Sequence, residues 1–211
     1  MATSAVTRPR RAPARRGQGA ALRADILDAA SGMVARSGDA STLTLRAVAR
    51  EVGVAATSIY LHFESVEALV EELKECRFGE LTAHLQQAAD AAGPDPLERL
   101  LARARAYLRF GIERPGEYAV MFAAKFGPVE GRPSHAKYAD AVFRDLAVEL
   151  RNVPRAGRPA MDADEALMIC FHVWTALHGM VSLRLLRPSM DWPDADAQAD
   201  DLVHRLAGPR V

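Results

Sequence analysis

Residues 56–62 hold two hydroxyls, a phenol and an imidazole within seven positions. Ile59 and Phe63 are four positions apart, so in a helix they share one face and turn inward. The remaining side chains then face solvent and include hydroxyl, phenol and imidazole groups. Such groups bind phosphate oxygens and base edges. The segment therefore predicts a DNA-contacting surface formed by Ala56, Thr57, Ser58, Tyr60, Leu61 and His62.

Other reactive side chains do not form a catalytic pattern. His172 and His178 are six positions apart, which places them on different faces of a helix. Asp201 and His204 share a face, but a solvated ion pair explains them. The two cysteines are far apart with no metal-ligand spacing, and no glycine-rich loop follows a strand. We therefore expect no enzyme, no metal site and no cofactor; a hydrolase or dehydrogenase activity in purified protein would reopen the enzyme alternative.

The residues before this polar segment predict the helix that positions it. Apolar residues recur at i, i+3, i+4 and i+7, as on an amphipathic helix, at Leu45, Val48, Ala49 and Val52. Thr44 precedes the stripe, where its hydroxyl can cap the free N–H groups. Gly53 follows the stripe and can adopt the positive φ that ends a helix. Two short helices joined by a tight glycine turn predict a helix-turn-helix, whose second helix enters the major groove.

The rest of the chain shows helical periodicity and no strand pattern. We expect an all-α fold of about nine helices, with a disordered basic arm at residues 1–19, a helix-turn-helix domain at 20–64, and a helical ligand-binding and dimerisation domain at 65–211. Ser65 is a suitable N-cap for a helix of about 26 residues, nearly 40 Å long, that links the two domains. The other expected helices cover residues 20–36, 45–52, 55–63, 96–114, 115–126, 135–152, 162–186 and 194–207, with loops at 126–134 and 153–159.

Charge is unevenly distributed along the 211 residues, although the net charge is zero. Residues 1–64 hold nine arginines and five acidic residues, a net charge of +4, and the remainder holds 18 basic and 22 acidic residues, a net charge of −4. A basic end suits a protein that presents that end to a polyanion, although chance asymmetry is the alternative. The arm carries Arg8, Arg10, Arg11, Arg15 and Arg16, which either lie along DNA or only aid solubility.

The most apolar run, residues 166–183, is about as long as a membrane span. His172, Thr175, His178 and Gly179 interrupt it, which favours a covered helix over a membrane helix because polar groups in lipid are costly. We expect this helix, with the one at 194–207, to pair with a second copy in a homodimer. The N-terminus lacks an apolar signal core and the cysteine usage fits a reducing compartment, so we expect a cytoplasmic protein.

Aromatic and methionine side chains in the C-terminal part suit an apolar ligand cavity with few polar groups. Ordinary core packing is the alternative for each of them, and neither reading is excluded by the sequence. Met168 and His172 could also line such a cavity. The candidate ligand-binding residues are Tyr107, Tyr118, Met121, Phe122, Phe143, Phe171, Trp174 and His178.

Residues 44–54 and 59–63, read together, resemble the DNA-binding domain of the tetracycline-repressor (TetR) family, and the match extends over about residues 20–73. The resemblance implies that Tyr60 and His62 grip phosphates and that Thr57 faces base edges. This sequence departs from the family pattern at Val66, where family members commonly carry a lysine. The phosphate contact that this lysine makes is therefore missing. The positions implied to contact DNA are Thr44, Arg46, Ala56, Thr57, Ser58, Tyr60, Leu61 and His62.

A weaker resemblance covers residues 107–122 and 174–179, which are similar to a C-terminal subfamily named for its Trp-His-Gly signature. Ligands differ within that subfamily, so ligand identity does not transfer. The resemblance implies a dimeric repressor that binds operator DNA and is released by a small apolar or amphipathic effector. The alternative within the same fold is a DNA-binding regulator that takes no ligand.

Overall fold

The computed structural model describes residues 19–122, 136–154 and 159–207. These residues form α-helices and one 3₁₀ turn, with no strand among them, which confirms the predicted all-α fold. The predicted arm up to residue 18 and the predicted loop at 126–134 lie outside the described residues. The elements are α1 (Gly19–Ser37), η1 (Ala40–Thr42), α2 (Leu45–Val52), α3 (Ala56–Tyr60), α4 (Val66–Ala91), α5 (Pro96–Glu113), α6 (Pro115–Met121), α7 (Ala136–Asn152), α8 (Ala163–Leu186) and α9 (Ala195–Leu206).

The helix ends follow the capping signals in the sequence. The Thr44 hydroxyl accepts a hydrogen bond from the amide of Ala47 at 3.2 Å, and the Ser65 hydroxyl accepts one from Ala68 at 3.1 Å. Gly53 ends α2 with φ +80°. The expected sixth helix was too long, since α6 ends at Met121 and Phe122 leaves the helical region with φ −107° and ψ 14°.

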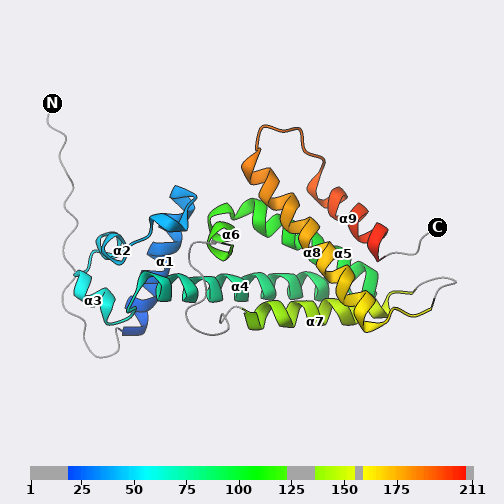
Figure 1. Ribbon diagram of the computed structural model, residues 1–211, viewed down its shortest axis with the longest axis horizontal. Helices are drawn as coiled ribbons and strands as arrows, with labels where there is room; N and C mark the ends of the chain where they lie inside the picture. Colours follow the sequence, from blue (N-terminus) through cyan, green and yellow to red (C-terminus); the bar gives the residue numbers. More distant parts are fainter. Residues whose placement is uncertain (1–18, 123–135, 155–158, 208–211) are drawn as a thin grey trace.

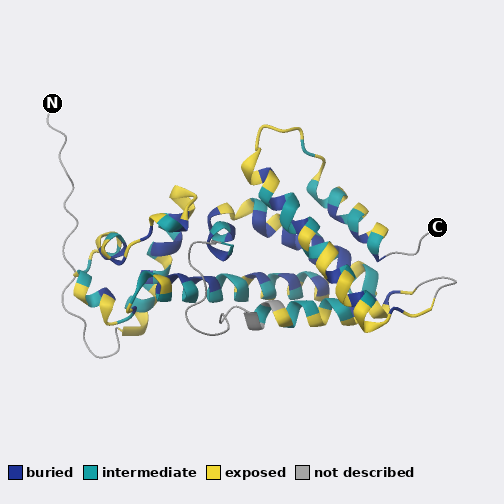
Figure 2. Cartoon of the chain, in the orientation of Figure 1, coloured by how far each residue is buried: buried dark blue, intermediate teal, exposed yellow. Residues whose placement is uncertain are grey.

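Helix α4 lies along the long axis of the molecule and contributes to two separate apolar cores (Figure 1; Figure 2). Its first turns close the core of the N-terminal helices α1–α3, called the head here. Its later turns pack in the body formed by α5, α7, α8 and α9. The predicted head core is buried at Ile26, Leu45, Val48, Ile59 and Phe63, whereas Met33 and Val52 lie half-buried at its margin.

Helix α6 joins the head to the body, which sequence periodicity did not indicate. Val120 of α6 is fully buried in the head core. At the other end of α6, a Cβ on Gly116 would overlap the Cα, Cβ and N atoms of Ala35 in α1, so the two helices touch at backbone distance. Glu117 also approaches Arg77 of α4 at 3.7 Å. The position of α6 is therefore fixed by contacts with both α1 and α4.

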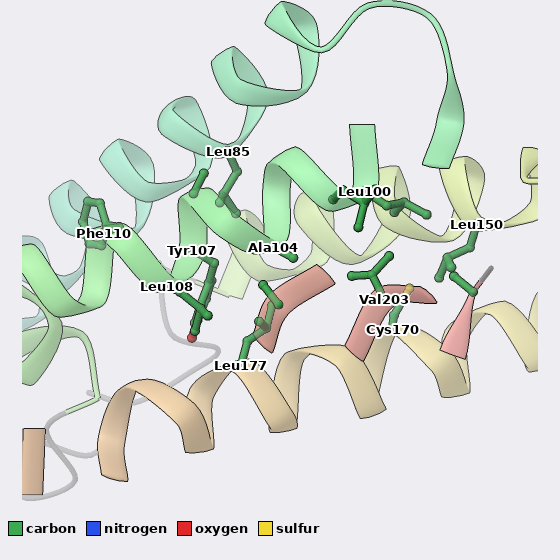
Figure 3. Close-up of a cluster of buried hydrophobic side chains, with 14 of the residues drawn as sticks. Leu85, Leu100, Ala104, Tyr107, Leu108, Phe110, Leu150, Cys170, Leu177 and Val203 are labelled. Atoms are coloured by element: carbon green, nitrogen blue, oxygen red, sulfur yellow. The ribbon is translucent and has the colours of Figure 1, made fainter. Parts of the chain in front are cut away.

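The body core is organised around α5, whose side chains contact α4, α8 and α9 (Figure 3). Leu108 and Phe110 of α5 are fully or almost fully buried. Arg105 forms an ion pair with Asp200 at 2.6 Å, and Arg109 pairs with Asp196, so α9 is held against α5 by charge as well as by apolar packing.

Candidate DNA interface and ligand cavity

Helix α3, the turn that follows it and the start of α2 present the predicted DNA contacts to solvent. The helix expected over residues 55–63 is shorter, since α3 ends at Tyr60 and Leu61 and His62 lie in a turn. Ile59 is fully buried and fixes the helix, whereas Tyr60 is 52% exposed and Leu61 is 85% exposed. All eight predicted side chains reach the surface. Thr44, Arg46, Thr57, Tyr60 and Leu61 are exposed, and Ala56, Ser58 and His62 are half-buried.

Arg23 of α1 ties this surface to α4. Its Nη1 donates to the carbonyl of His62 at 2.8 Å, and its Nε donates to Glu72 at 2.7 Å. The guanidinium also lies 4.4 Å from the ring centre of Phe63. Sequence reasoning missed this residue, because an arginine near the start of a helix looks like part of a solvated face.

A cavity of about 380 Å³ lies within the body between α4, α5, α7 and α8. Its wall is almost wholly apolar, as in ligand pockets. Helices α4 and α7 contribute much of the wall, which the sequence did not distinguish from ordinary core stripes. Those residues include Phe78, Leu81, Leu85, Val142, Leu146 and Leu150.

Six of the eight predicted ligand-binding residues line this cavity. They are Tyr107, Met121, Phe122, Phe143, Phe171 and Trp174. Tyr118 and His178 do not line it and instead lie behind Tyr107. Met168 and His172, which were also candidates for the wall, are exposed on α8 and are not in it, because they turn outward from the bundle.

Tyr107, Tyr118 and His178 form a chain of hydrogen bonds at one side of the cavity. The Tyr107 and Tyr118 oxygens are 3.1 Å apart, and Tyr118 Oη is 2.6 Å from His178 Nδ1. Burial raises the pKa of Tyr107 to about 12 and also raises the pKa of Tyr118. Burial lowers the pKa of His178, so the imidazole is neutral at pH 7. The three groups are therefore uncharged.

One charged residue, Arg103, is among the described residues of the cavity wall, and it is only 5% exposed. Its guanidinium binds both carboxylate oxygens of Glu149, at 2.9 and 3.1 Å, and donates to Gln86. Arg99 also binds Glu149, at 2.9 Å, and pairs with Asp90 at 3.1 Å. Two arginines thus face two carboxylates, so the group carries no net charge.

Helix α8 has a second, outward face that is apolar and uncovered. Met168, Leu183 and Leu186 are each at least 49% exposed, whereas monomers rarely expose a contiguous apolar patch. By length and composition α8 is apolar enough to cross a membrane, with a mean hydropathy of 1.5 in its most apolar stretch. It packs against α5, α7 and α9 on its other face.

An outward recognition helix on a helical body with a cavity defines a helix-turn-helix regulator. Comparison with known proteins agrees. Residues 26–73 match the family model for bacterial regulatory proteins of the tetR family, and residues 100–207 match the tetracyclin repressor-like C-terminal domain. The chain belongs to the TetR family of transcriptional regulators. Such proteins are not enzymes, which removes the enzyme alternative.

Three individual relatives share between 16% and 31% of their aligned residues with this chain. The HTH-type transcriptional regulator Rv0681 of Mycobacterium tuberculosis is 28% identical over 166 residues, covering 79% of this chain and 71% of Rv0681. The HTH-type transcriptional repressor KstR2 of Mycolicibacterium smegmatis is 31% identical over 144 residues, covering 68% of this chain and 58% of KstR2. The structure of FadR from Bacillus subtilis, in complex with stearoyl-CoA, shares the fold with a TM-score of 0.68 at 16% identity, covering 89% of this chain and 99% of that chain.

Proposed function

We propose that this protein is a cytoplasmic transcriptional repressor that binds operator DNA through α3 and leaves it when an apolar or amphipathic molecule enters the body. The observation that supports this most is the direct connection between the two sites. Met121 and Phe122, at the end of α6, line the cavity, and Val120 beside them is buried in the head core. A ligand that displaces the end of α6 must therefore disturb the head. KstR2 is named a repressor, and FadR was crystallised with a long-chain acyl compound.

Ligand release requires that the ligand bind one arrangement of the head more tightly than the other. Gly116 and Val120 couple α6 to the head, so the arrangement that fits a filled cavity and the arrangement that fits DNA can differ. A body that binds no ligand is the remaining alternative. Stabilisation of the protein against thermal unfolding by a metabolite would separate the two.

The proposed assembly is a homodimer formed mainly by the exposed face of α8. Helix α9 turns Ala199 and Val203 into the body and leaves Asp201, His204 and Arg205 exposed, so it would supply a polar rim. Two copies related by a two-fold axis would place the heads about one helical turn of DNA apart.

The DNA interface is tested by two substitutions on α3. Tyr60→Ala is expected to weaken binding to all sequences alike, because a phosphate contact carries no sequence information. Thr57→Ala is expected to relax the preference at one base position, at a cost of about 1–3 kcal/mol for the preferred base. Sequencing of DNA selected by the wild type and both variants measures this. Selection of unrelated sequences by all three proteins, with equal affinity, would contradict the proposal.

The arginine-rich arm is proposed to replace the phosphate contact missing at Val66. Its attachment point supports this, since a Cβ at Gly19 would lie 3.8 Å from Cε1 of His62. Removal of residues 1–18 is expected to weaken operator binding and to lower the salt slope by about 0.9 per lost contact. Fluorescence anisotropy at several salt concentrations measures the slope, and an unchanged slope would rule the arm out as a DNA contact.

A further inference from the structure

Glu149 of α7 neutralises Arg103, the one charged residue among the described members of the cavity wall. Its Oε2 accepts a hydrogen bond from Arg103 Nε at 2.9 Å, and its Oε1 accepts one from Arg103 Nη2 at 3.1 Å. The same Oε1 accepts a bond from Arg99 Nε at 2.9 Å. Asp90, the other carboxylate of this group, has a side chain that is 60% exposed, whereas Glu149 is buried. Glu149 is therefore the carboxylate whose charge solvent screens least.

Polar side chains of the wall are also bonded within the protein. The Thr82 hydroxyl donates to the carbonyl of Phe78 at 2.8 Å, and the Cys170 thiol donates to a carbonyl of α7. The Tyr107 hydroxyl is hydrogen-bonded to that of Tyr118. Most of the remaining described wall is aliphatic or aromatic. A charged ligand would therefore find no unmatched opposite charge in the described part of the wall.

An ionised carboxylate in this cavity would lie in apolar surroundings without a counterion of its own. Under such conditions a carboxyl group takes up a proton instead of staying charged. A fatty acid would then bind as the neutral acid. A carboxyl group with a pKa near that of glutamate, about 4.3, is less than about 1% neutral at pH 7. The charge balance of the wall therefore costs a carboxylate about a hundredfold in affinity or more, and it costs an ester nothing.

From this charge balance we propose that Glu149 is a specificity-determining residue, which cancels the charge of Arg103 so that the cavity selects uncharged, largely apolar molecules and rejects carboxylates. Glu149 acts through Arg103, because Glu149 itself does not line the cavity. The inference rests on the proposed function only in taking the cavity as the effector site.

The first test compares methyl octanoate with octanoate, two probes with the same acyl chain. Isothermal titration of purified full-length protein at pH 7 is expected to show the ester binding about a hundredfold more tightly or better. Ala104→Leu, which enlarges a wall residue, is expected to weaken binding of the ester if the ester lies in the cavity. Equal affinities, tighter binding of octanoate or no binding of the ester would overturn the proposal, as would an ester affinity that Ala104→Leu leaves unchanged.

The pH dependence of binding gives an independent readout. If octanoate binds as the neutral acid, its affinity falls about tenfold from about pH 6.5 to about pH 7.5, and each molecule takes up about one proton. The ester carries no titratable group, so it is the control for protonation of protein side chains such as His178, whose pKa is lowered by burial. Titrations in buffers of different ionisation enthalpy measure the proton uptake. An octanoate affinity as independent of pH as that of the ester would show that the cavity accepts the charged form, against the proposal.

Glu149→Gln tests the role of Glu149 directly, because it removes the charge and keeps the size of the side chain. Arg103 then lacks its carboxylate, and an opposite charge favours the ionised form of a nearby carboxyl group. Octanoate is expected to bind about tenfold more tightly than it does to the wild type, with the ester nearly unchanged. Asp90→Asn is the matched control, since it removes the same charge from the same group at an exposed position. Solvent screens that position, so the ratio of affinities is expected to stay that of the wild type.

A gain in octanoate affinity cannot result from a damaged fold, so it distinguishes control of specificity from a merely structural role. An unchanged ratio of affinities in Glu149→Gln, or an equal gain in Asp90→Asn, would overturn the assignment to Glu149. The wild-type comparison and its pH dependence need no variant, so the proposal remains testable if Glu149→Gln does not fold. Since the titrations contain no DNA, failure of methyl octanoate to release the operator would count against the proposed function alone.

Discussion

Replacing Leu183 or Met168 by glutamate is expected to separate the dimer and to lower affinity for a two-fold operator by more than about a hundredfold. Both side chains lie on the exposed face of α8, at 49% and 56% exposure, and neither lines the cavity. In a two-fold interface each substitution places two carboxylates in apolar surroundings, where an unpaired charge is costly. Loss of the second head also removes the gain from binding two half-sites at once, which is typically 10²–10⁴-fold.

Val148→Glu is the matched control. Val148 is an apolar residue of α7 with 53% exposure, so the substitution adds the same charge at a similar exposed fraction outside the proposed interface. Analytical ultracentrifugation gives the mass of each variant, and fluorescence anisotropy gives its affinity for whole and half operators. Retention of the dimer by both α8 variants would show that another surface forms the interface. Equal dissociation of Val148→Glu would show that added charge alone is responsible.

The head could be predicted closely because its signals are local. Thr44, Gly53 and Ser65 act on backbone atoms within a few residues of themselves, and the capping bonds and the positive φ are found where the sequence placed them. The DNA-facing residues followed from the inward pair Ile59 and Phe63, since both are buried although Phe63 lies beyond the end of α3, and the side chains between them face outward.

The cavity and the contact of α6 with the head depend on tertiary packing, which hydrophobic periodicity does not encode. An apolar stripe is the same whether its helix faces a core or a hollow, so the α4 and α7 wall residues were not distinguished. His178 and Tyr118 were predicted as ligand contacts because of their chemistry. In the fold Tyr107 lies between them and the cavity, which the sequence does not indicate. Val120 was assigned to the body, whereas it is buried in the head, because the fold brings α6 back to α1.

Gly116→Ala is expected to separate α6 from α1, with a large loss of stability and of operator affinity. The added methyl would meet backbone atoms of Ala35, including N at 2.9 Å, and backbone cannot move aside as a flexible side chain can. Overpacking in a tight site costs about 1–3 kcal/mol, which exceeds the gain of up to about 1 kcal/mol that alanine brings to a helix. Urea unfolding measures the net loss, and anisotropy without ligand measures operator binding.

Gly32→Ala, in the same helix as Ala35, provides the control. The nearest atom to an added Cβ there is Nη1 of Arg36, at 3.4 Å, which belongs to a flexible side chain. This variant is expected to be as stable as the wild type or up to about 1 kcal/mol more stable, and to bind the operator normally. If Gly116→Ala were equally harmless, the close approach of α6 to α1 would not hold the head in place. If it weakened DNA binding while the purified protein stayed folded, the substitution would reproduce without a ligand the displacement of α6 that the proposed mechanism assigns to one.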